Sequence, residues 1–233
     1  ELFGRLATKA MLPAMESIVD DWQPDLVIRD PCEYASAIVA KRRDIPVAQV
    51  AIGLAEVEWG SIDIAAPALE EHEPGLVETL RSSPYLSRFP ASLDPSRFVD
   101  TRRFRETATH EPRPVTDWWN GSGAPLLYVT FGTVLGHMSI AAGVYATMLG
   151  AVAEIDARVL LTVGRRFDPS SLGRIPSNVH VEPWVDQDDV LAEAELVVCH
   201  GGSGTTFGAL AAGVPLVLVP VFADQFANAQ RVG

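Results

Sequence analysis

The sequence predicts an α/β protein built from two doubly wound domains with parallel sheets. Short apolar runs alternate with helix patterns in both halves of the chain, as expected for parallel strands joined by helices. A segment with two prolines and no apolar periodicity separates the halves. We therefore expect an N-terminal domain over residues 1–105, a linker over residues 106–114 and a C-terminal domain over residues 115–233.

The first half contains one strand–helix–strand step. Residues 25–28 and 46–50 are short apolar runs that predict buried strands, and residues 33–42 carry an amphipathic helix pattern. Residues 61–81 are polar and helix-prone. A doubly wound domain usually has five or six strands, so we expect this domain to be incomplete, with its first strands before residue 1.

The second half shows the same alternation more clearly. A helix is predicted over residues 139–155. Apolar runs predict strands over residues 126–130, 158–163, 179–182, 196–199 and 214–220. Such a sheet binds ligands at the carboxyl ends of its strands.

A glycine-rich loop, His200 to Gly204, follows one of these strands and precedes a helix that runs from Thr205 to Gly213. Glycines let the backbone approach a ligand closely, and the free amides and dipole of a helix start favour a phosphate. Neither common phosphate motif fits. Phe207 stands where a dinucleotide fingerprint needs its third glycine, and no Lys-Ser or Lys-Thr pair follows the glycines as in a Walker loop.

Charge and composition exclude other classes of protein. The formal net charge of −12 argues against a nucleic-acid partner, because phosphate-backbone binding needs clustered Lys and Arg. No apolar run approaches the roughly 20 residues of a membrane span, so no stable membrane insertion is expected. The two cysteines, Cys32 and Cys199, adjoin predicted strands and are expected to be buried free thiols. A cytoplasmic location is the expectation.

The chain resembles family 1 glycosyltransferases, in particular the bacterial branch that decorates macrolide and enediyne antibiotics. The resemblance implies the GT-B fold, in which two Rossmann-like domains face a cleft. Members of this family continue past the position of Gly233, so we expect the C-terminal domain to be incomplete at its C-terminus as well. The resemblance spans about fifty residues: Trp184-Val185, His200-Gly201-Gly202-Ser203-Gly204-Thr205, Gly213-Val214-Pro215, Pro220, Asp224-Gln225 and Asn228-Ala229.

The resemblance implies roles in binding a nucleotide-sugar donor. The base lies against Trp184 and the Val185 backbone, and the sugar hydroxyls are held by Asp224 and Gln225. The diphosphate is held by Gly132, Thr133, His200, Gly201, Gly202, Ser203, Gly204 and Thr205. The residues alone also allow an ordinary turn at Gly132-Thr133, a core histidine at His200, a packing role for Trp184 and a helix N-cap at Asp224.

Asp30 is the candidate catalytic residue. It ends a predicted strand directly before Pro31, where it either faces a ligand or caps the following helix. The resemblance implies that this aspartate orients a histidine that deprotonates the acceptor hydroxyl. None of the five histidines precedes Asp30. We therefore expect the partner histidine to lie upstream, which leaves the 233 residues alone inactive.

The resemblance implies an inverting, metal-independent glycosyltransferase without a cofactor, whose co-substrate is a nucleoside-diphosphate sugar and whose acceptor is a small-molecule aglycone. In the plant branch a glutamate on the helix after the glycine loop grips both ribose hydroxyls. Gly208 stands at that position here, so we expect a thymidine-diphosphate deoxysugar rather than a uridine-diphosphate hexose.

Three alternatives remain open. A non-catalytic GT-B partner protein would suit the missing histidine. A cell-wall N-acetylglucosamine transferase would need a basic, apolar membrane-facing patch, whereas the first half is acidic around Glu70 to Glu78. A nucleotide-sugar epimerase of the same fold would need further cleft carboxylates besides Asp224. A homodimer is compatible with the sequence, and the acceptor pocket carries no motif, although Trp59 could line it or simply pack on a neighbour.

Overall fold

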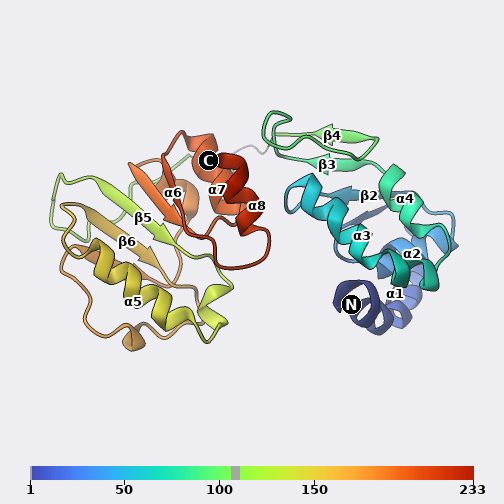
Figure 1. The fold of residues 1–233 in the computed structure, drawn as a ribbon, viewed down its shortest axis with the longest axis horizontal. Helices are drawn as coiled ribbons and strands as arrows, with labels where there is room; N and C mark the ends of the chain where they lie inside the picture. The colour runs from blue at the N-terminus through green and yellow to red at the C-terminus, as the bar shows by residue number, and fades with distance from the viewer. Residues whose placement is uncertain (1, 106–110) are drawn as a thin grey trace. The chain divides into compact units, whose positions relative to one another are not determined.

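The chain separates into two units, residues 1–107 and residues 108–233. The computed structural model describes residues 2–105 and 111–233 (Figure 1). The expected linker, residues 106–114, spans this division. Its residues 106–110 lie outside the described residues, and residues 111–114 have neither helix nor strand.

The first unit contains a parallel sheet of four strands in the order β1-β2-β3-β4. The strands are β1 (Val27–Arg29), β2 (Val47–Val50), β3 (Tyr85–Ser87) and β4 (Thr101–Arg103). The helices are a π-helical turn (Leu2–Ala7), α1 (Thr8–Trp22), α2 (Ala35–Arg42), α3 (Ala55–His72) and α4 (Leu76–Ser82). The predicted strand–helix–strand step is therefore confirmed as β1, α2 and β2.

Two features of the first unit differ from the sequence prediction. Strand β1 was expected to be buried, but Ile28 is 61% exposed because β1 lies at the edge of the sheet. The helix expected over residues 61–81 begins at Ala55 and is broken at Gly75, which has a positive φ of 75°. Helix α3 starts early because the carboxylate of Asp94, 39 residues away, accepts the amide hydrogen of Ala55 at 2.8 Å.

The second unit contains a parallel sheet of five strands in the order β7-β6-β5-β8-β9. The strands are β5 (Leu126–Thr130), β6 (Arg158–Thr162), β7 (Val179–Glu182), β8 (Leu196–Cys199) and β9 (Leu216–Leu218). All five predicted strands are confirmed, and β9 is shorter than the predicted residues 214–220. Parallel pairing is expected because helices follow β5, β7, β8 and β9 and cover the faces of the sheet.

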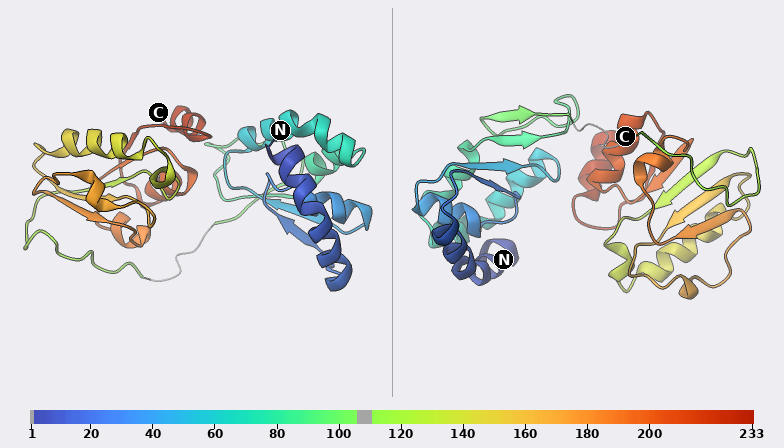
Figure 2. Two further views of the ribbon diagram at one scale, coloured as in Figure 1. Left: turned by 90° about the horizontal axis from the view of Figure 1, so that it is seen from below. Right: turned by 180° about the vertical axis from the view of Figure 1, so that it is seen from behind.

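Helices cover both faces of this sheet (Figures 1 and 2). They are α5 (Ala141–Val152), α6 (Gln187–Leu191), α7 (Ser203–Ala212) and α8 (Gln225–Val232), with short 3₁₀ turns at Leu135–His137 and Pro169–Leu172. Alternate residues of β5 reach opposite faces: Leu127 and Val129 join the core that contains α5, whereas Leu126 and Tyr128 join the core that contains α6 and α7. The loops at the carboxyl ends of the strands are thereby held on a rigid support.

Candidate functional site

The strand order sets the order of five loops along the carboxyl edge of the second sheet. The loop after β7 carries Trp184, the loop after β6 carries Arg165 and the loop after β5 carries Gly132. The loops after β8 and β9 carry His200 and Asp224, respectively. Neighbouring strands lie about 4.8 Å apart, so the edge from the first loop to the last extends over about 19 Å. An elongated ligand could contact all five loops, and the expected donor-binding residues lie in four of them.

The His200 ring lies between two glycines. A Cβ atom on Gly132 would lie 2.8 Å from both Cε1 and Nε2 of His200, and a Cβ on Gly202 would lie closer still to Nε2. Gly132 also has a positive φ of 72°, which disfavours other residues. The glycines therefore let the imidazole join the β5 loop to the β8 loop, so the predicted phosphate-loop residues are brought together.

Burial lowers the pKa of His200, although the backbone of Thr130 and the charge of Asp224 favour its protonated form. The imidazole is therefore neutral at pH 7, with one nitrogen as donor and the other as acceptor. Its Nδ1 atom is buried and has no hydrogen-bond partner among the described residues. A neutral imidazole has one N–H, which can donate to a phosphate oxygen without bringing a charge to the loop.

Helix α7 begins at Ser203, two residues earlier than predicted, with Gly202 in an extended conformation before it. The first-turn amides of an α-helix have no partner within the helix. The side chains of Ser203 and Thr205 are buried, whereas Gly204 is exposed. An anion at this helix start would therefore meet backbone amides rather than the two hydroxyls.

The buried side-chain amide of Asn228 donates hydrogen bonds to three residues in and around the glycine loop. Its Nδ2 atom donates to the carbonyl of Gly201 at 2.8 Å, to Ser203 Oγ at 3.2 Å and to Asp224 Oδ2 at 3.0 Å. Ser203 Oγ itself donates to Asp224 Oδ2 at 3.1 Å. Asp224 occupies the N-cap position of helix α8, as the sequence allowed, but its side chain makes no capping hydrogen bond. Its carboxylate is instead fixed against the glycine loop.

Gln225 is 3% exposed and holds the turn that precedes α8. Its Oε1 atom accepts the amide hydrogens of Val221 at 2.8 Å and Phe222 at 2.9 Å. The turn also contains Ala223 with a positive φ of 56°, a conformation that costs a residue with a Cβ roughly 1 kcal/mol. The loop that presents Asp224 is therefore tightly specified.

Trp184 lies at the far end of the edge and is 49% exposed. The Cζ atom of Arg165 lies 4.7 Å from the centroid of the Trp184 ring. Val185 is half-buried and packs on the core that contains α6 and α7. The structure thus presents an exposed aromatic ring on a backbone anchored by Val185.

Gln187 and Gly208 face each other across α6 and α7. A Cβ atom on Gly208 would lie 2.7 Å from Gln187 Nε2, and the same Nε2 lies 3.5 Å from the carbonyl of Gly204. The missing side chain of Gly208 therefore leaves room that the Gln187 amide occupies. Sequence reasoning missed Gln187, Arg165 and the central role of Asn228, because each depends on contacts between loops.

In the first unit, Asp30 is exposed at the end of β1, and its Oδ1 accepts the amide hydrogen of Cys32 at 2.7 Å. It does not cap α2. Glu33 does so instead, because its carboxylate accepts the amide hydrogen of Ser36 at 3.1 Å. Arg29 is buried and donates to the carbonyl groups of Pro31, at 3.0 Å, and Glu33. These hydrogen bonds fix the backbone of the loop that carries Asp30.

Glu58 is a buried carboxylate at the same edge of the first sheet. It accepts hydrogen bonds from Tyr85 Oη at 2.6 Å and from the amides of Ile52 at 2.8 Å and Gly53 at 2.7 Å. Burial raises its pKa to about 7, against the opposing effect of these hydrogen bonds. The thiol pKa of Cys32, which is half-buried, is also raised, first by burial and then by the charges of Asp30 and Glu58. The polar sequence around Glu58 gave no sign of this burial.

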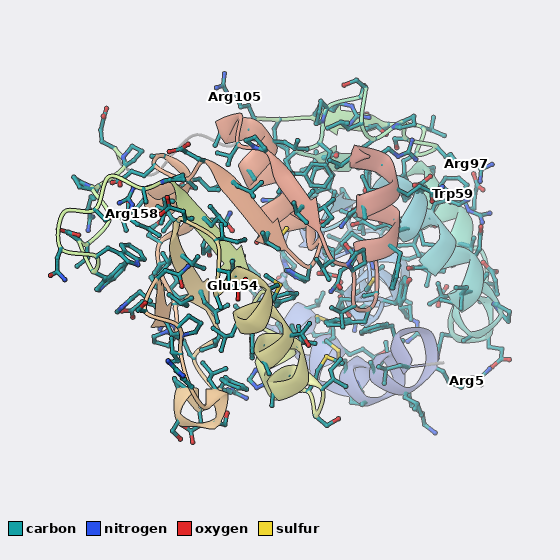
Figure 3. The ribbon with its side chains drawn as sticks, turned by 60° about the vertical axis from the view of Figure 1, so that its left-hand side comes forward. Arg5, Trp59, Arg97, Arg105, Glu154 and Arg158 are labelled. Carbon is teal, nitrogen blue, oxygen red and sulfur yellow. The ribbon has the colours of Figure 1, made fainter. Side chains whose placement is uncertain are left out.

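Trp59 packs within the first unit. Its ring meets Phe98 edge-on at 5.2 Å, and the Cζ atom of Arg81 lies 4.7 Å from its centroid. Figure 3 labels Trp59 and Arg97, whose Cζ atom lies 5.9 Å from the same centroid. The packing alternative for Trp59 therefore accounts for its position.

Residues 2–105 and 111–233 contain neither a cluster of metal ligands nor a membrane-spanning helix. No group of three or more His, Cys, Asp or Glu side chains in these ranges is placed to hold a metal ion. Within the same ranges, no helix has both the length and the apolar character to cross a membrane.

Solved structures of glycosyltransferases share this architecture. SnogD of Streptomyces nogalater matches with a TM-score of 0.73 and 26% identity, over 97% of this chain and 64% of that one. The spinosyn rhamnosyltransferase SpnG complexed with thymidine diphosphate matches in fold, with a TM-score of 0.77 and 23% identity, over 97% of this chain and 62% of that one. Fold and loop cluster thus define the GT-B class of glycosyltransferases.

The chain belongs to the family described as erythromycin biosynthesis protein CIII-like, whose N-terminal domain matches residues 2–130 and whose C-terminal domain matches residues 146–233. L-demethylnoviosyl transferase of Streptomyces niveus is 32% identical over 227 residues, which cover 95% of this chain and 59% of that protein. The chain therefore spans about three fifths of the length of this relative. The resemblance to natural-product glycosyltransferases is confirmed.

Proposed function

We propose that the second unit binds a nucleoside-diphosphate sugar along the carboxyl edge of its sheet, in the order base, diphosphate, sugar. The observation that carries this proposal is the order of the loops, because Trp184, the Gly132 and His200 loops, and Asp224 follow one another along one edge. An aromatic ring suits a base, helix amides suit a diphosphate, and a fixed carboxylate suits sugar hydroxyls. The family assignment supports the same ligand class.

We propose that the whole protein is an inverting glycosyltransferase that acts on a hydroxyl of a small-molecule aglycone. The acceptor oxygen forms a bond to the anomeric carbon while the bond from that carbon to the diphosphate oxygen breaks. The acceptor proton passes to a histidine outside these 233 residues, oriented by Asp30, and the electron pair leaves with the nucleoside diphosphate. The loops after β5 and β8 stabilise the charge that develops on the leaving group, which is a role that a metal ion plays in other transferases.

The donor is proposed to be a thymidine-diphosphate deoxysugar. Gly208 offers no carboxylate to a ribose 2′-hydroxyl, so a donor without this hydroxyl loses no hydrogen bond. SpnG, which shares the fold, is described as complexed with thymidine diphosphate. L-demethylnoviosyl transferase, a relative, is named for the sugar that it transfers. The thymidine diphosphate bound to SpnG supports a thymidine-diphosphate donor for this chain.

Calorimetric titration of the 233-residue protein with thymidine diphosphate and uridine diphosphate tests the proposal. We expect both nucleotides to bind, with thymidine diphosphate at least fivefold tighter. A preference for uridine diphosphate would overturn the donor assignment alone. If neither nucleotide bound to protein whose thermal unfolding is cooperative, the assignment of the edge as a nucleotide site would be wrong.

A further inference from the structure

Arg165 lies between the part of the edge assigned to the base and the part assigned to the diphosphate. It follows β6 by three residues, and β6 lies between β7, which leads to Trp184, and β5, which leads to Gly132. The β6 and β5 loops are in contact: a Cβ atom on Gly164 would lie 3.7 Å from the carbonyl oxygen of Thr133. The backbone of Arg165 is therefore anchored beside the proposed phosphate loop.

The guanidinium of Arg165 rests on an aromatic ring rather than on a carboxylate. Its Cζ lies 4.7 Å from the Trp184 centroid, and the residue is exposed. Within residues 2–105 and 111–233, Arg165 has no carboxylate partner, whereas Arg42 pairs with Glu16 and Glu73 at 2.8 and 2.9 Å. In a chain with a formal net charge of −12, this cation is left unneutralised beside an anion-binding loop.

A base and Arg165 cannot share the same face of Trp184 in this arrangement. A planar ring inserted between them would need about 3.5 Å on each side, or about 7 Å in all, whereas the separation is 4.7 Å. An exposed cation–π contact is weak, whereas a guanidinium pairs with phosphate oxygens through charged, bidentate hydrogen bonds. The long side chain can therefore leave the ring and pair with a phosphate, with a net gain in binding free energy.

We propose that Arg165 is a donor-binding residue that rests on Trp184 in the free protein, leaves the ring when the base stacks there, and then pairs with the diphosphate. This inference rests on the proposed function, because it takes the ligand to be a nucleoside diphosphate. Arg165 would therefore increase the affinity for a charged nucleotide but not the affinity for an uncharged nucleoside.

The test compares the wild-type protein with R165A and R165K, and uses R174A as a matched control that removes another exposed arginine from the same unit. Thymidine diphosphate is titrated by calorimetry at two salt concentrations, and thymidine by quenching of tryptophan fluorescence. We expect R165A to lower the affinity for thymidine diphosphate at least fivefold and to make that affinity depend less on salt. The affinity for thymidine should stay the same or increase. R165K should lie between, because it keeps the charge without the planar fork. R174A should match the wild type.

The inference is overturned if R165A changes thymidine diphosphate binding by less than fivefold, or weakens thymidine as much as the diphosphate. The second outcome would mean that Arg165 only supports the Trp184 ring. Both outcomes leave the proposed function standing, because the wild-type protein still binds the nucleotide. Absence of binding by the wild type overturns the proposed function as well. Thermal unfolding without ligand checks that each variant is folded.

Discussion

The side-chain amide of Asn228, one turn into helix α8, donates to the carboxylate of Asp224 at 3.0 Å and fixes it against the glycine loop. Asn228 is fully buried and also binds the Gly201 carbonyl. One residue thereby joins the proposed sugar end of the site to the proposed phosphate end. Removal of this amide should therefore weaken ligand binding at both ends of the proposed site.

We expect N228A to lower the free energy of unfolding by about 2 kcal/mol, because it leaves buried acceptors without a donor. Thymidine diphosphate affinity should fall along with stability, since the Gly201 loop loses its anchor. Urea unfolding and calorimetry measure the two effects. Q230A removes an exposed side chain from the same helix and should change neither. An N228A protein as stable as Q230A would contradict the anchoring role.

The glycines around His200 give a second prediction. G202A places a Cβ atom against the His200 ring, so the imidazole must move and the β5 and β8 loops must separate. We expect thymidine diphosphate affinity to fall more than tenfold. G150A is the matched control, because a Cβ there also meets nothing within 4 Å and Gly150 lies in helix α5, outside the proposed site. Equal affinities of the two variants, measured by calorimetry, would show that the packing of His200 does not matter for binding.

Glu58 should make stability depend on pH. Its pKa is about 7 in the folded protein against an ordinary value of 4.5, so the folded state binds the proton more tightly than the unfolded state. The stabilising contribution is therefore complete below pH 4.5 and is lost as the pH rises to 7, by about 3 kcal/mol in all. E58Q should remove this dependence and melt at a higher temperature than the wild type at pH 8.

Thermal unfolding of wild type, E58Q and D25N at pH 5 and pH 8 measures this effect. Asp25 is an exposed carboxylate of the same unit, and D25N should keep the wild-type difference between the two pH values. If E58Q kept that difference as well, the pH dependence would have to come from another group.

Gly208 gives a prediction about donor choice. We expect G208E to improve uridine diphosphate affinity about five- to tenfold relative to thymidine diphosphate, because the new carboxylate can accept from a ribose 2′-hydroxyl. The new Cβ would lie 2.7 Å from the flexible end of Gln187, which can move aside, and 3.4 Å from Leu191 Cδ1, which is an ordinary van der Waals contact. G208A controls for that movement. An unchanged ratio of the two affinities in calorimetric titrations would place the ribose away from this helix.

The second unit was largely predictable from its sequence, because its strands are uninterrupted apolar runs. The bounds of β5, β7 and β8 match the prediction to the residue. In contrast, β3 and β4 have the sequences YLS and TRR and carry no strand pattern. Their pairing is imposed by the neighbouring strand and not by their own residues.

The candidate site was predictable only at positions where the residue type itself indicates a particular backbone conformation or function. Glycines at Gly132 and Gly202 signal a close backbone approach, and a histidine beside them signals a ligand. The positions of Arg165, Gln187 and Glu58 depend on side chains from other loops, so no local pattern could give them. Asp94 capping α3 across 39 residues is the same kind of feature.

The order β7-β6-β5-β8-β9 also makes the proposed nucleotide site a reporter of folding. The five loops at the carboxyl edge are scattered over nearly a hundred residues of sequence and come together only when every strand has paired. A nucleotide that contacts all of them would bind the native unit and not its partly folded forms. Such a ligand would raise the stability of the whole unit by mass action, so resistance to proteolysis in its presence would measure how much of a preparation is correctly folded.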